Sequence, residues 1–148
     1  MACKTETKLI GDTEYSCTQM PPSLAGPIKF QLIGVFGSAL KDIAEAMQLS
    51  EDKQSAVLIS AVQSIIKDTG PTELFAFIKS LVLKTSVKKP GCEYERMTEP
   101  MFEEIFAADN MGDMYKVFFF VIQVNYAGFL KGLGLKQVSE IFNQPTPS

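Results

Sequence analysis

The stretch MFEEIFAADNMGDMYKVFFFVIQVNYAGFLK, residues 101–131, decides the fold of this chain. It contains six of the eleven phenylalanines and two of the four tyrosines, so large apolar side chains are concentrated here. Asp113 stands where a helix N-cap belongs, and the residues after it predict a helix from Met114 to about Phe129. One face of that helix follows i, i+3, i+4, i+7 spacing through Tyr115, Phe118, Phe119, Ile122, Tyr126 and Phe129.

The opposite side of this helix is apolar as well, which is typical of a helix that is buried or lies in a membrane. The unbroken apolar run, residues 117–122, is short, and Lys116, Gln123 and Asn125 interrupt its flanks. A membrane-spanning helix needs about 20 predominantly apolar residues. We therefore expect a central core helix, with the rest of the chain packed around it.

Composition favours one soluble globular domain and argues against several functions. Hydrophobic residues make up 46% and charged residues 21%, which excludes wholesale disorder. The net charge of −3 and a single arginine, Arg96, argue against nucleic-acid binding. The first fifteen residues lack the apolar segment of a signal peptide, so we expect a cytoplasmic protein.

Residues 7–19 predict a β-hairpin. Its turn, Gly11-Asp12, suits a type II′ or type I′ geometry. Tyr15 and Cys17 would then point to the same face. Because an isolated hairpin is only marginally stable, we expect this one to lie on helices or on another molecule.

Apolar periodicity predicts that residues 23–131 form an antiparallel helical core. Before the central helix, helices are expected over the following segments: 23–48, 50–68, a helix beginning at Pro71, and a short helix capped by Thr98. Glycine inside a helix often marks close approach of a neighbour, so the first helix should cross another near Gly34 and Gly37. A second, short hairpin is expected with its turn at 88–91 and its returning strand at 92–94.

The end of the chain predicts less regular structure. Gly132 and Gly134 should end the central helix, and residues 135–142 could form one last short amphipathic helix. Residues 143–148 contain two prolines and read as a disordered tail. The prediction is a mainly α-helical single domain, 1–148, with a short N-terminal hairpin.

The sequence indicates no catalytic chemistry. Without histidine, the serine–histidine and cysteine–histidine arrangements cannot be built, and the three cysteines lack metal-site spacing. The Gly132-Leu133-Gly134 string follows a helix instead of a strand, which is the wrong context for phosphate binding. Cys17 and Cys92 have no basic neighbour that would activate a thiol. We expect no enzyme, no metal and no cofactor.

Several large apolar residues fall outside the periodic stripes, and the seven methionines would provide an adaptable surface. One interpretation is that these residues fill a small helical core. The other is that some of them line a groove for an apolar helix or peptide of a partner. On the second interpretation, the candidate contact residues are Phe75, Met97, Met101, Phe120 and Phe142.

The order of three groups of strings resembles the tail assembly chaperones of long-tailed bacteriophages. The first two are KLIGDTEYSCTQMP at 8–21 and LIGVFGSAL at 32–40. The third comprises FEEIF at 102–106, MYKV at 114–117 and QVNYAGFL at 123–130. This order resembles the family's hairpin, antiparallel helices and closing FEELF…LYKV…VNF pattern over residues 7 to about 131. Residues 131–148 have no counterpart in that pattern.

The resemblance implies a non-enzymatic chaperone that binds the tape measure protein and keeps it soluble until the tail tube polymerises. It implies action in the host cytoplasm and absence from the mature virion. In some relatives a frameshifted longer form recruits the tail tube protein, and self-association is compatible with the family. The family has no agreed catalytic or ligand residues to carry over.

Three other functions remain open on the sequence. The main alternative is a structural tail-completion or neck component of the virion. A small enzyme would need a pocket with perturbed carboxylates. A carrier would need the helices to enclose a cavity for a lipid or another apolar ligand.

Overall fold

The computed structural model describes residues 4–37, 39–46, 51–66 and 70–143, with side chains of the last segment described as far as Phe129. It is 65% helical, which confirms the mainly α prediction. The elements follow in this order: β1 (Thr5–Ile10), β2 (Thr13–Thr18), α1 (Pro22–Phe36), α2 (Ala39–Ala46), α3 (Glu51–Ile65), α4 (Pro71–Val82), β3 (Ser86–Lys88), β4 (Glu95–Arg96), α5 (Glu99–Ile105), the 3-10 helix η1 (Ala108–Asn110) and α6 (Met111–Asn143). The expected tail at 143–148 falls almost wholly outside the described residues.

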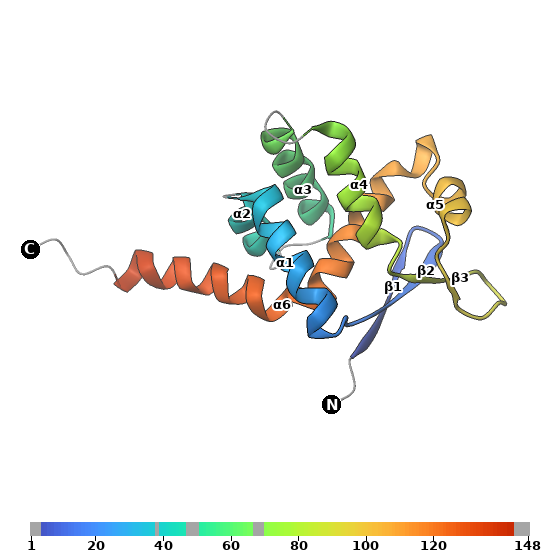
Figure 1. Cartoon of the computed structure of the whole chain (residues 1–148), viewed down its shortest axis with the longest axis horizontal. Coiled ribbons are helices and arrows are strands. Elements are labelled where there is room, and N and C mark those ends of the chain that lie inside the picture. Colours follow the sequence, from blue (N-terminus) through green and yellow to red (C-terminus); the bar gives the residue numbers. More distant parts are fainter. Residues whose placement is uncertain (1–3, 38, 47–50, 67–69, 144–148) are drawn as a thin grey trace, which may run out of the picture.

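Helix α6 is the core of the fold. It runs through the middle of the molecule in Figure 1 and contacts α2, α3, α4 and the first two strands. Its side chains from Val117 to Ile122 are all at most 4% exposed, which confirms the predicted central helix. Phe118 lies between Phe36 and Phe77, with ring centroids 5.9 and 6.2 Å away. The helix therefore holds helices from both halves of the chain together.

The boundaries of α6 differ from the predicted ones. The helix begins at Met111, so Asp113 lies in its first turn and is not the N-cap. At the other end, Gly132 and Gly134 do not stop it, and the helix continues to Asn143. Glycine costs a helix only about 1 kcal/mol, which neighbouring residues can offset. The actual interruption is at Tyr126, where φ is −128° and ψ is 16°.

The long helix expected over 23–48 is two helices. Gly37 follows α1 with a φ of 50°, a conformation that favours glycine, and the axis turns by 110° between α1 and residues 39–45. The expected helix crossing is also wrong, because no other element in the described part of the chain comes within 4 Å of where a Cβ would stand at Gly34 or Gly37. Gly37 is therefore a turn residue.

The N-terminal hairpin is confirmed and belongs to a four-stranded antiparallel sheet of order β1-β2-β3-β4. Gly11 has a φ of 61° whereas Asp12 does not have a positive φ, which selects the type II′ turn. Tyr15 and Cys17 are both 1% exposed and face the helices. The second hairpin is present, although its returning strand is β4, slightly later than expected.

Two shorter helices begin where the sequence predicts. Pro71 is the first residue of α4, where its missing N–H removes no helical hydrogen bond. Thr98 caps α5, and its hydroxyl accepts a hydrogen bond from the backbone N–H of Met101 at 3.3 Å. Pro71 therefore fixes where α4 begins, and Thr98 fixes where the polar connection between α4 and α5 ends.

Candidate protein-binding surface

Helix α1 combines an apolar sequence with little burial. Only Leu32 and Phe36 are fully buried among its fifteen residues. Leu24, Phe30 and Ile33 are 52%, 73% and 38% exposed. A helix that is apolar on all sides is normally covered, so α1 presents surface that the rest of the described chain leaves open.

On the exposed side of α1, one large side chain lies between two glycines. Gly26, Phe30 and Gly34 are four residues apart, so they follow one row along the helix. Apart from the backbone of α1 itself, no atom of the described residues lies within 4 Å of the Cβ positions of Gly26 and Gly34. Phe30 therefore projects between two gaps in the helix surface. We call Gly26, Phe30, Ile33 and Gly34 the α1 face. Leu24 lies outside it, because about two and a half helical turns separate Leu24 from Ile33.

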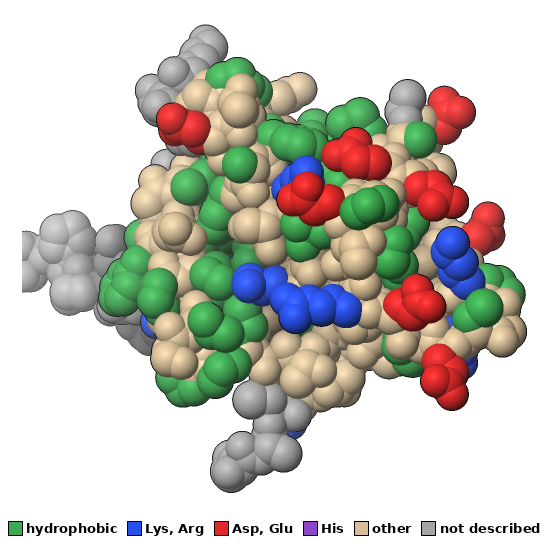
Figure 2. All heavy atoms as spheres, turned by 45° about the vertical axis from the view of Figure 1, so that its right-hand side comes forward, with side chains coloured by type: hydrophobic (Ala, Val, Ile, Leu, Met, Phe, Trp, Pro, Cys, Tyr) green, Lys and Arg blue, Asp and Glu red, His purple; other side chains and the backbone are tan. Residues whose placement is uncertain are grey.

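One apolar area of the surface lies apart from most of the acidic side chains. Figure 2 shows hydrophobic side chains gathered at the lower left of the view, while most acidic side chains lie at the right. Lys29 lies beside the α1 face, with its Nζ 4.2 Å from the centroid of the Phe129 ring. That contact joins α1 to α6 and covers part of the Phe129 ring.

Hydrogen bonds around the interruption of α6 set the position of α1. We call this group of bonds, made by Asn125, Tyr126 and Gln19, the joint. Asn125 accepts a hydrogen bond from the backbone N–H of Met20 at 2.7 Å, and its amide donates to the Val121 carbonyl at 2.9 Å. The Tyr126 hydroxyl donates to the Ala25 carbonyl in α1 at 2.8 Å. Gln19 donates to the Val124 carbonyl at 3.1 Å. The end of the hairpin and the start of α1 are thus both bonded to α6.

The ionisable groups near this joint are held in their neutral forms. Burial raises the pKa of the Tyr126 hydroxyl to about 12. Burial raises the pKa of the Cys17 thiol to about 11, against a smaller lowering by the Asn125 amide. A thiol with such a pKa is a poor nucleophile at neutral pH. The joint is a structural arrangement with no activated group.

The five predicted contact residues do not form one surface. Phe75 is 39% exposed on α4, with its ring edge toward Phe102 at 6.1 Å. Met101 is half-buried. Met97 and Phe120 are buried at 3% and 4% exposure. The side chain of Phe142 lies outside the described residues.

Sequence reasoning missed the α1 face, although a signal was present. The buried stripe of that segment passes through Leu32 and Phe36. Phe30 and Ile33 fall off that stripe, as Phe75 does on α4. Apolar residues outside the buried stripe of α1 also indicate a possible contact surface. The glycines beside them instead suggested that a neighbouring helix covers α1.

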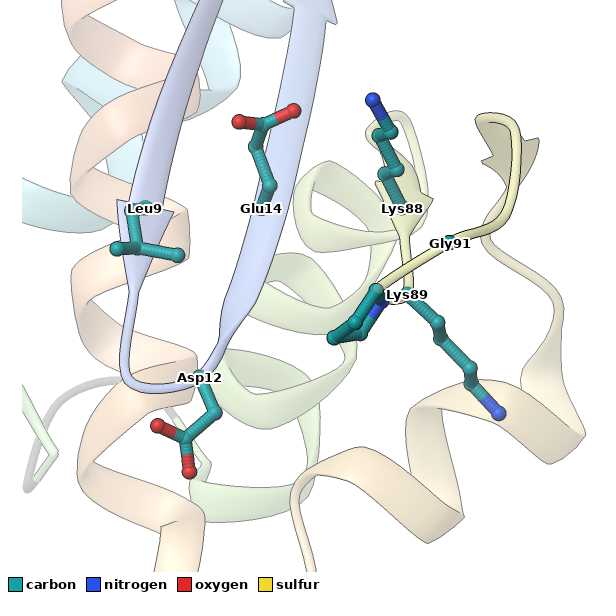
Figure 3. A pocket seen from close by; sticks show the side chains of 7 residues that line it. Leu9, Asp12, Glu14, Lys88, Lys89 and Gly91 are labelled. Carbon is teal, nitrogen blue, oxygen red and sulfur yellow. The ribbon is translucent and has the colours of Figure 1, made fainter.

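A shallow cavity of about 270 Å³ lies on the face of the sheet that points away from the helices, between the two hairpin turns. Its lining consists of Leu9, Asp12, Glu14, Lys88, Lys89, Pro90 and Gly91. Figure 3 shows Lys89 pointing away from it. Glu14 accepts a hydrogen bond from the Tyr94 hydroxyl. Asp12, Lys88 and Lys89 are exposed and Glu14 is half-buried, so the cavity is an open, charged hollow of the surface.

The described ranges show neither a metal site nor a single membrane-spanning helix. No group of three or more cysteine, aspartate or glutamate side chains is placed to hold a metal ion there. No single helix within those ranges is long and apolar enough to cross a bilayer. The bent pair of α1 with residues 39–45 passes that test only when the two are taken together.

The fold and the α1 face define a small, mainly helical protein with an open apolar face suited to another polypeptide. The chain belongs to the phage tail assembly chaperone (TAC) family, whose model matches residues 11–136. Comparison with curated proteins and with solved structures finds no match. Membership of the family suggests a non-enzymatic role, with protein partners in tail assembly inside the infected host cell.

Proposed function

We propose that this chaperone binds the tape measure protein through the α1 face and keeps it soluble in the host cytoplasm until the tail tube polymerises. The observation that carries the proposal is the 73% exposure of Phe30 on an apolar helix. An apolar helical segment in water tends to aggregate until it is covered. An amphipathic helix laid against the α1 face would bury apolar surface on both molecules.

The size of the face suits a reversible contact. Fully burying a phenylalanine or leucine side chain stabilises a complex by about 1.5–3 kcal/mol. Phe30 and Ile33 are already partly covered, and association itself has an entropic cost, so one site should bind weakly. Many copies along one long client would raise the overall affinity, whereas each copy could still dissociate during assembly.

Phe75 and the half-buried Met101 provide a second, smaller contact area in this proposal, close to Phe102. Met97 and Phe120 could take part only if the chain opened, because both are buried. We therefore place the main contact on α1. Recruitment of the tail tube protein is a further part of the proposal that no residue of the α1 face explains.

The test is co-expression with the tape measure protein of the same phage, followed by soluble yield and pull-down. We expect the wild-type chain to raise the yield and Phe30→Ser to abolish most of the effect. Ile59→Ser is the matched control, because Ile59 is 41% exposed on another helix, α3, and lies outside the α1 face. Unchanged yield with no recovered complex would contradict the proposal.

Mass spectrometry of purified virions separates this function from a structural role. The chaperone should be absent from mature particles. A tail-completion or neck component would instead be present in stoichiometric amounts.

A further inference from the structure

Strand β1 forms one edge of the sheet. In the order β1-β2-β3-β4, the described part of the chain adds no strand beyond β1. The strand is six residues long, and Thr5, Glu6, Thr7 and Leu9 are exposed. An exposed edge offers unpaired N–H and C=O groups to another strand unless something blocks it.

The pairing with β2 shows which backbone groups are available. The Lys4 carbonyl accepts a hydrogen bond from the Gln19 N–H at 2.8 Å, so Lys4 faces β2. In an antiparallel ladder, alternate residues direct their backbone groups to opposite sides. Thr5, Thr7 and Leu9 therefore direct their N–H and C=O groups toward the free edge.

A second copy of β1 can be added antiparallel only if outward-directed residues face one another. The register that pairs all three outward-directed residues, Thr5, Thr7 and Leu9, places Thr7 opposite Thr7 of the second copy. Glu6 then lies opposite Lys8 of the other copy, and symmetry repeats this pair. Moving the symmetry axis to Glu6 or to Lys8 places two like charges opposite each other, which is destabilising.

We propose that β1 is a dimerisation edge, through which two copies of this chain pair antiparallel about Thr7 and join their sheets. The occupant of the edge is a second copy because the charge pattern of the strand is complementary to itself in one register. Lys8 also interacts within its own chain. Its positive charge still favours the register in which Glu6 of the other copy lies opposite it. The dimerisation edge and the α1 face share no residue.

The test measures the dimer of the purified full-length chain by analytical ultracentrifugation and native mass spectrometry. We expect a concentration-dependent species of twice the 16.3 kDa monomer mass. Glu6→Lys alone and Lys8→Glu alone should each weaken the dimer about tenfold, because two attractive pairs become repulsive. The double variant Glu6→Lys/Lys8→Glu restores opposite charges and should recover wild-type dimerisation.

A backbone variant tests the edge itself. Thr7→Pro removes the central outward N–H, and proline is tolerated on an edge strand whose N–H faces solvent. The circular dichroism spectrum reports whether the monomer still folds. A folded Thr7→Pro chain should be monomeric.

Three results would overturn the dimerisation edge. These are a wild-type chain that stays monomeric at all concentrations, a dimer unaffected by the single charge changes, and a double variant that fails to recover. Because the tape measure protein is absent from these measurements, their outcome is independent of whether the α1 face binds it.

Discussion

Exposure divides the off-stripe aromatic residues into two groups. Phe120 is 4% exposed within α6, whereas Phe30 is 73% exposed on α1. The two side chains have the same chemistry, so only their positions in the fold decide whether they stabilise the domain or remain available to a partner. Truncating each of them should therefore affect different measurements.

Phe120→Ala should lower the free energy of unfolding by about 3–5 kcal/mol, because it removes a buried ring and leaves a cavity. Urea denaturation followed by circular dichroism measures this change. Phe30→Ala is the matched control and should change stability by less than 1 kcal/mol. A small loss for Phe120→Ala with lost client binding would instead make that residue a contact.

At the scale of elements, α1 depends on the joint in α6. Asn125 bonds Met20 and Val121, while Tyr126 bonds Ala25. The first and third of these bonds join the end of the hairpin and the start of α1 to α6, while the Asn125–Val121 bond lies within α6 itself. The QVNY part of the resemblance string thus corresponds to a bend with its own hydrogen-bond partners.

Asn125→Ala should destabilise the chain by about 1–3 kcal/mol, because the part-buried N–H of Met20 loses its acceptor. Hydrogen exchange should also become faster in the first turns of α1, while α4 stays protected. Gln123→Ala, two residues earlier in α6, is the control for substitution in this helix. Equal protection of α1 in both variants would show that the joint does not hold it.

At the scale of the molecule, three buried groups make stability sensitive to alkaline pH. Burial is the main cause that raises the pKa of Cys17 from 9.0 to about 11 and those of Tyr15 and Tyr126 from 10.0 to about 12. The unfolded chain loses these protons first. Stability is therefore fully present below about pH 9 and falls as pH rises through the range from 9 to 12.

Urea titrations between pH 7 and 11 would measure this decline, which each group steepens by at most about 1.4 kcal/mol per pH unit. In Cys17→Ala, the part of the decline that begins near pH 9 should disappear, leaving the part due to the tyrosines. A stability that is constant up to pH 11 would contradict the burial of these groups.

Much of this fold follows from local sequence patterns. The Gly11-Asp12 turn, Pro71 at a helix start and the Thr98 cap each have a short-range cause, so the sequence predicts them. Gly37 shows the limit, because a glycine that permits close packing and a glycine that permits a turn look alike. Exposure of Phe30 depends on which neighbours the fold brings to α1, and no local pattern contains that information.

The two ends of α1 are attached in different ways. Its first turns are bonded to α6 through the Ala25 carbonyl, and its last residue, Phe36, is buried against the Phe118 ring of α6. A hydrogen bond thus holds one end of the helix on α6, and ring packing holds the other. A partner segment would therefore bind to a helix that is already ordered. Little conformational entropy of this chain would be lost on binding.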